Sequence, residues 1–172
     1  MDQLMDNYLY PPIINVETGT DHDYCTTYKI NGGKVGFSEF PGFSSENGKV
    51  YVDGSCYEGT WKTLARSGSA MCQINHSRDP WYSISVQFPT PKDYPQSASI
   101  GEHMAAARTA GHTSGEPVGL IADCSSVLSV FNAHTTIKYH HKNPMAGIWR
   151  NHDLTKTNTI SKVKSTPRRA RR

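Results

Sequence analysis

The feature that most constrains this chain is a change of hydrophobic period near its middle. Apolar residues occupy the even-numbered positions from Tyr82 to Phe88, with mostly polar residues between them. This two-residue alternation predicts a half-buried strand. Shortly afterwards the period lengthens, and Ile100, Met104 and Ala107 recur at helical spacing. A chain that passes from strand to helix and back to strand is expected to fold as a mixed α/β domain.

The remaining elements follow from turn residues and short apolar runs. We expect strands at 49–53, 65–75, 81–88, 117–122 and 159–164, and helices at 96–110, 125–131 and 144–150. Three consecutive strands separated by turns predict an antiparallel meander. A helical crossover then brings the fourth strand parallel to the first. The expected sheet is therefore mixed, with five strands in the order 3-2-1-4-5 and helices flanking it.

Composition divides the 172 residues into three parts. Residues 1–47, rich in Gly, Pro, Asn, Asp and Thr, are interpreted as a leader or linker of uncertain structure. Residues 48–166 form the predicted α/β domain. Residues 167–172, Pro-Arg-Arg-Ala-Arg-Arg, form a basic tail. A chain of this length is expected to hold one domain with some additional sequence.

The net charge of +3 conceals an asymmetry along the chain. Residues 1–137 hold 8 Lys and Arg against 14 Asp and Glu, whereas residues 138–172 hold 10 Lys and Arg and a single acid, Asp153. A basic segment of this density suits contact with phosphates. The alternative is a solvated tail without a partner.

Several classes of protein are disfavoured by the sequence. No apolar run is long enough to cross a bilayer, and the acidic start of the chain does not match a secretory signal. The four cysteines, Cys25, Cys56, Cys72 and Cys124, form no C-x-x-C pair, so neither a zinc ribbon nor a disulfide scaffold is indicated. We expect reduced thiols, an intracellular location (cytoplasmic or nuclear) and no membrane partner.

Three acids occupy positions that can bring them together. Asp53 ends the first predicted strand, Glu102 lies in the first turns of the long helix, and Asp123 ends the fourth strand. Clustered carboxylates repel one another unless cations lie between them, and they are the hard oxygen ligands that Mg²⁺ prefers. Each acid also has a structural alternative: a turn residue before Gly54, a solvated helix face, and a helix N-cap.

Five segments in this order resemble the type 1 ribonuclease H family, especially the domains attached to reverse transcriptases of retroelements. The segments are Val50–Cys56, Ala65–Ala70, Gln96–Glu102, Leu120–Val127 and Ile160–Lys164. The resemblance implies a ribonuclease H-like fold that hydrolyses the RNA strand of RNA–DNA hybrids with Mg²⁺, or Mn²⁺. It implies catalytic and metal-binding roles for Asp53, Glu102 and Asp123. It further implies nucleic acid contacts at Ser55, Cys56, Lys162, Lys164, Arg168 and Arg169.

Two departures from the family pattern bear on activity. The family usually has a histidine just after the fifth strand, where this chain has about Thr166, and then a fourth carboxylate near the start of a last helix. No acid follows Asp153 here, so we expect a C-terminally truncated domain whose last helix is missing and whose activity is impaired. Two alternatives stay open: a catalytically inactive ribonuclease H-like module that binds nucleic acid, and a small basic structural protein that binds nucleic acid.

Overall fold

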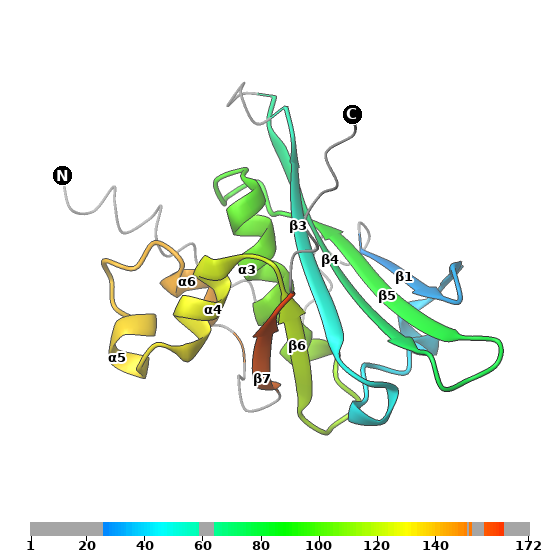
Figure 1. Cartoon of the computed structure of the whole chain (residues 1–172). Coiled ribbons are helices and arrows are strands. Elements are labelled where there is room, and N and C mark those ends of the chain that lie inside the picture. Colours follow the sequence, from blue (N-terminus) through cyan, green and yellow to red (C-terminus); the bar gives the residue numbers. More distant parts are fainter. Residues whose placement is uncertain (1–25, 59–63, 151, 153–156, 164–172) are drawn as a thin grey trace, which may run out of the picture.

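The structure is a computed structural model that describes residues 26–58, 64–150, 152 and 157–163 (Figure 1). Its strands form one mixed, seven-stranded sheet in the order β2-β1-β5-β4-β3-β6-β7. The strands are β1 (Thr27–Ile30), β2 (Gly33–Val35), β3 (Val50–Tyr57), β4 (Arg66–Asn75), β5 (Tyr82–Pro89), β6 (Val118–Ala122) and β7 (Thr157–Lys162). The expected α/β class is confirmed.

The helices gather on one side of this sheet (Figure 1). They are α3 (Ala98–Arg108), α4 (Ser125–Asn132), α5 (Thr135–Lys138) and α6 (Ala146–Arg150), with three short 3-10 turns, η1 (Phe37–Glu39), η2 (Ser45–Asn47) and η3 (Thr109–His112). Helix α3 packs on β3 and β4, and α4 and α6 pack beside it. The short helix α5 was not expected from the sequence.

The five predicted strands form the centre and one edge of the sheet. Strands β3, β4 and β5 form the antiparallel meander. Strand β6 runs parallel to β3, as predicted from the helical crossover, and β7 runs parallel to β6. The predicted order 3-2-1-4-5 therefore corresponds to the observed β5-β4-β3-β6-β7.

The prediction of only five strands is wrong, because β1 and β2 extend the sheet beyond β5. Asn31 and Gly32 both adopt positive φ, 48° and 83°, as the central residues of a type I′ hairpin turn do. Strand β1 then pairs with β5 in an antiparallel register that places Thr27 opposite Gln87. The stretch that composition interpreted as leader or linker thus contributes two strands to the same sheet.

The residues after this hairpin are anchored by aromatic packing. The Tyr28 ring lies 5.4 Å from Phe37 and 5.2 Å from Phe40, and Phe40 contacts Phe43 edge to face. Phe43 has no exposed surface, and its backbone N–H donates to the carbonyl of His112. Tyr28 and Phe43 therefore belong to the hydrophobic core, and Phe40 packs against it.

Helix α3 is the central element of the core. Its N-cap is Ser97, whose hydroxyl accepts a hydrogen bond from the backbone N–H of Ile100 at 3.2 Å, so the helix begins close to the start expected from the sequence. Every residue from Ile100 to Ala107 is buried, since the sheet covers one side of the helix and α4 and α6 contact it as well. The helix is therefore buried all round rather than amphipathic.

The opposite face of β3 remains exposed. Val50 and Val52 point to the helix side and are buried, whereas Tyr51, Asp53 and Ser55 alternate with them on the other face and are exposed. This is the side-chain period of a strand with one covered face.

Candidate metal centre

The parallel register of β3 and β6 brings Asp53 and Asp123 together. The two strands pair at Val50 with Leu120 and at Tyr51 with Ile121. Asp53 and Asp123 each lie two residues after the last of these pairs, so they are at the same level along the sheet. The prediction that these two strands bring the acids together is confirmed. The prediction that Asp53 ends its strand is wrong, because β3 continues to Tyr57 through its pairing with β4.

Glu102 reaches the same place from helix α3, because the helix contacts β3 backbone to backbone. A Cβ atom added to Gly54 would lie 2.5 Å from the carbonyl carbon of Gly101 and 2.7 Å from the carbonyl oxygen of Ala98. A Cβ atom added to Gly101 would lie 2.5 Å from the carbonyl oxygen of Gly68. Glycine at both positions permits this approach, which carries Glu102 to the edge of β3.

The three carboxylates form a compact cluster. One oxygen from each of Asp53, Glu102 and Asp123 lies within 4.8 Å of the others. Asp53 and Asp123 are exposed, whereas Glu102 retains only 7% of its surface. Sequence reasoning named all three residues, and the structure brings all three together.

The raised pKa of Glu102 shows that the cluster lacks a compensating positive charge within the part of the chain that the structure describes. Burial raises the pKa of Glu102 to about 7, with further upward contributions from the Asp123 and Asp53 charges, against a hydrogen bond from the Gly54 backbone that lowers the pKa. Its Oε2 atom is buried and has no hydrogen-bond partner among the described residues. A buried acceptor without a partner carries a desolvation cost, which a cation bound to this oxygen would relieve.

The donor set fits a hard divalent cation. Three carboxylates supply only oxygen ligands, which Mg²⁺, Mn²⁺ and Ca²⁺ prefer over softer metals. The cluster includes neither cysteine nor histidine, which a zinc site would normally contain. The coarser prediction, that these acids can hold a metal ion, is therefore supported by the structure.

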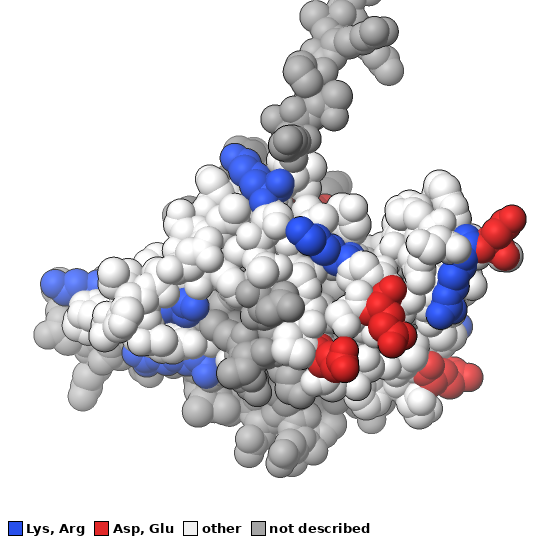
Figure 2. Space-filling model, turned by 60° about the horizontal axis from the view of Figure 1, so that its bottom comes forward, with Lys and Arg blue, Asp and Glu red and all other residues white. Residues whose placement is uncertain are grey.

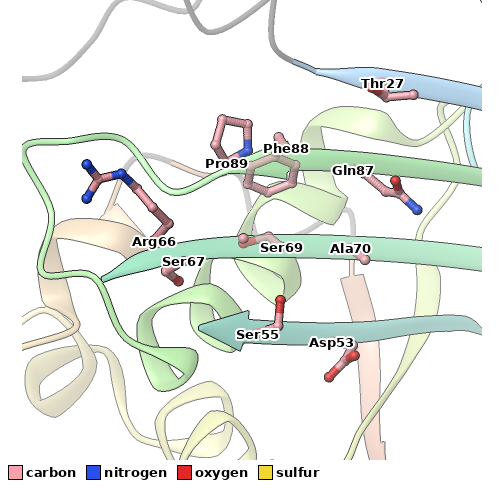
Figure 3. Close-up of a pocket in the computed structure, with 11 residues that line it drawn as sticks. Thr27, Asp53, Ser55, Arg66, Ser67, Ser69, Ala70, Gln87, Phe88 and Pro89 are labelled. Atoms are coloured by element: carbon pink, nitrogen blue, oxygen red, sulfur yellow. The ribbon is translucent and has the colours of Figure 1, made fainter. Parts of the chain in front are cut away.

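A hollow of about 520 Å³ opens next to the cluster on the uncovered face of the sheet. Figure 3 shows Asp53 and Ser55 of β3 along one side of it, Arg66 at one end, and Gln87 of β5 and Thr27 of β1 along the other side. Apart from Asp53 and Arg66, its lining is uncharged. Asp53 is the member of the cluster that lines this hollow, so the cluster is reached from the hollow through Asp53.

The residues expected to contact nucleic acid lie in different places. Ser55 is exposed and lines the hollow. Cys56 points to the other face, where its sulfur is 3.6 Å from the carbonyl oxygen of Gln96. Lys162 is exposed and pairs with Ala122, directly before Asp123. The other three, Lys164, Arg168 and Arg169, lie outside the described residues.

Charged side chains on the face shown in Figure 2 are dispersed. In the view of Figure 2, acidic and basic side chains occupy separate small groups rather than one large patch of a single sign. Within the described ranges, no helix has the length and apolar character that crossing a membrane requires. The acid cluster beside the hollow is therefore the best candidate for a functional site among the described residues.

Comparisons of this sequence with protein-family models and with curated proteins identify no relative. No protein-family model matches the chain, and a search of curated proteins gives no match either. The functional assignment consequently depends on the geometry of the site.

Sequence reasoning missed two kinds of residue at this site. Arg66 is the first residue of β4 and belongs to no sequence motif. It lines the hollow because it pairs with Tyr57 across β3 and β4. Gly54 and Gly101 do not stand out in the hydrophobic pattern. The small residues Ala98 and Gly101 near the start of the helix do indicate that the helix can pack closely on a neighbouring element.

Proposed function

We propose that this chain is a ribonuclease H-like, Mg²⁺-dependent endoribonuclease that hydrolyses the RNA strand of RNA–DNA hybrids. The observation that carries the proposal is the set of three carboxylates within 4.8 Å, one of them with a buried, unpartnered oxygen. The strand order β5-β4-β3-β6-β7, with Asp53 and Asp123 carried by the adjacent parallel strands β3 and β6, agrees with what the family resemblance implies. The resemblance is to domains attached to reverse transcriptases of retroelements.

Each residue of the cluster has a definite task in this proposal. Bound Mg²⁺ or Mn²⁺ supplies an activated water and stabilises charge on the leaving oxygen in such hydrolysis. Asp53 and Asp123 are exposed, so they can bind the cation from the side that the phosphodiester approaches. Glu102 would hold it from the buried side, through its unpartnered oxygen. A second ion would be held less well, because residues 154–172 contain no acid.

The surroundings of the cluster suit a phosphodiester chain. Arg66 lies four residues along β4 from Ala70, the residue opposite Asp53, which is about 13 Å at the rise of a strand. Ser55 lies between them on the same face, and Lys162 lies beside the end of β6. Such backbone contacts position nucleic acid without reading its sequence. The described cysteines, Cys56, Cys72 and Cys124, are free thiols, which agrees with the intracellular location we propose.

The proposal is tested with labelled RNA–DNA hybrid, double-stranded RNA, single-stranded RNA and duplex DNA, each in Mg²⁺ and in Mn²⁺. We expect cleavage of the RNA strand of the hybrid only, with more activity in Mn²⁺ than in Mg²⁺. Asp53→Asn should abolish cleavage, since it removes an anionic ligand. Asp93→Asn, the same change at an exposed acid outside the cluster, should leave cleavage unchanged.

Two results would lead to the alternatives. Tight, salt-dependent binding of the hybrid without cleavage in either metal would favour a catalytically inactive binding module. Binding that is equal for all nucleic acids and insensitive to Asp53→Asn would favour a small basic structural protein.

A further inference from the structure

A chain of hydrogen bonds runs through the core behind the acid cluster. His103, the residue after Glu102, is fully buried in α3. The indole Nε1–H of Trp149 donates to Nδ1 of His103 at 3.0 Å. Because an indole N–H can only donate, Nδ1 is the acceptor. The proton of the neutral ring then resides on Nε2, which lies 3.0 Å from the hydroxyl oxygen of Ser126 and donates to it.

The chain continues to the residue beside Asp123. Since the Ser126 hydroxyl accepts from His103, its own hydrogen is free to be donated to the sulfur of Cys124, 3.1 Å away. Cys124 is the N-cap of α4 and makes no side-chain capping bond to the helix. A helix start without a cap is normally less stable by about 1 kcal/mol. The bond from His103 to Ser126 in the first turn therefore ties down an end of α4 that its own cap does not secure.

These hydrogen bonds link the segments that carry two of the three carboxylates, Glu102 and Asp123. Glu102 precedes His103 on α3, and Asp123 precedes Cys124 at the start of α4. Trp149 of α6 holds the His103 ring in place, because the two rings pack edge to face with centroids 5.8 Å apart. A shift of α4 relative to α3 would thus break the chain and change the separation of the two carboxylates.

We propose that His103 is a positioning residue, which holds the Asp123 turn at metal-binding distance from Glu102 through Ser126 and is itself fixed by Trp149. This inference rests on the proposed function, because it concerns the same cation site. Mg²⁺ requires nearly ideal octahedral geometry with ligands at about 2.0–2.1 Å. Losing a partner that orients ligands typically reduces metal affinity by about 10- to 100-fold.

The test compares Mn²⁺ affinity, measured by calorimetry, among variants of the full chain. Ser126→Ala removes the hydroxyl at an exposed position, so the variant should fold, and its Mn²⁺ dissociation constant should rise about tenfold or more. Ser125→Ala, the same change at the adjacent exposed residue, is the matched control and should bind Mn²⁺ like the wild type. Thermal unfolding in EDTA checks that both variants are folded at the assay temperature, since losing the bond to His103 is expected to lower the Tm of Ser126→Ala.

A second pair of variants separates positioning from packing. His103→Leu should weaken Mn²⁺ binding at least as much as Ser126→Ala, and combining the two should add little, because they break the same chain. His103→Gln offers an oxygen to Trp149 and an amide N–H to Ser126, so it should recover part of the lost affinity.

The outcomes distinguish this inference from the proposed function. Equal Mn²⁺ affinity in the wild type, Ser126→Ala and His103→Leu would overturn the positioning role even if the chain cleaves hybrids. Equal losses in Ser125→Ala and Ser126→Ala would overturn it as well. If the wild type binds Mn²⁺ more tightly than Ser126→Ala but cleaves nothing, the positioning role stands and the proposed hydrolysis fails. A wild type that binds no Mn²⁺ overturns both.

Discussion

Replacing Gly54 with alanine should separate Glu102 from Asp53, because the added methyl group would occupy space that helix α3 fills. The new Cβ would lie 2.5 Å from the carbonyl carbon of Gly101 and 2.7 Å from the carbonyl oxygen of Ala98, whereas ordinary contacts begin at 3.4 Å. Both neighbours are backbone atoms, so no side-chain rotation can relieve the clash. The backbone nitrogen of Glu102 would be closer still, so the helix must move away from β3 by at least about 0.9 Å.

Two measurable effects follow from this displacement. Forcing a methyl group into a well-packed region costs typically about 1–3 kcal/mol, which for a chain of this size lowers Tm by roughly 2–12 °C. The same movement takes Glu102 away from the other two carboxylates by a large fraction of a metal–ligand bond length, about 2.0–2.1 Å for Mg²⁺. We expect the dissociation constant for Mn²⁺ or Mg²⁺ to rise at least tenfold.

The assay measures Tm in EDTA and Mn²⁺ affinity by calorimetry for the wild type and for Gly54→Ala. Gly111→Ala is the control, because a Cβ there meets no atom within 4 Å and its backbone lies outside the left-handed region. That variant should be as stable as the wild type or more stable by about 0.4–1 kcal/mol, with unchanged metal affinity. A Gly54→Ala protein with wild-type Tm and wild-type Mn²⁺ affinity would refute the close packing of α3 on β3.

Three further predictions concern pH, the core and the basic end. Without metal, the free energy of unfolding should fall as pH rises from about 4.5 to about 7, because folded Glu102 keeps a proton that the unfolded chain releases. Urea unfolding in EDTA at pH 5 and pH 8 measures this change. A Glu102→Gln variant that keeps the full pH dependence would contradict the assignment to Glu102. Phe43→Ala should destabilise the fold by about 3–5 kcal/mol, whereas Phe37→Ala, at a side chain 71% exposed, should destabilise it far less. Equal losses of stability by chemical denaturation would show that Phe43 is not part of the core. Truncation before Pro167 removes four arginines and should reduce the slope of log affinity against log salt by up to about 3–4, so an unchanged slope for hybrid binding would show that they make no phosphate contacts.

Much of the site could be predicted from the sequence because its cause is local. Asp53 and Asp123 follow the apolar runs of two strands, and a parallel crossover places the two acids at the same level. The turn expected at Asp53-Gly54 does not form, because β3 continues to Tyr57 in pairing with β4. Glu102 followed from its place in a well-capped helix. What no pattern revealed was how far the helix approaches the sheet, since this depends on Gly54 and Gly101 meeting across two elements.

The parts that could not be predicted depend on contacts between distant residues. Asn31-Gly32 is a recognisable hairpin signal, yet nothing near it in the sequence indicates that β1 pairs with β5. His103 and Trp149 are 46 residues apart, and neither stands out by spacing. A buried histidine becomes a positioning residue only when its two partners are known.

The pairing of β1 with β5 also constrains how the chain can fold during synthesis. Thr27 pairs with Gln87, so β1 leaves the ribosome about 60 residues before its partner strand exists, a delay of about 3–12 s at 5–20 residues per second. During that interval β1 can pair with β2 across the type I′ turn, but its partner strand β5 is not yet available. Until the hairpin docks, the outer edge of β5 has unpaired backbone groups that can pair with other chains and seed aggregation. Docking of the hairpin is therefore the step that protects the nascent sheet from its neighbours on the polysome.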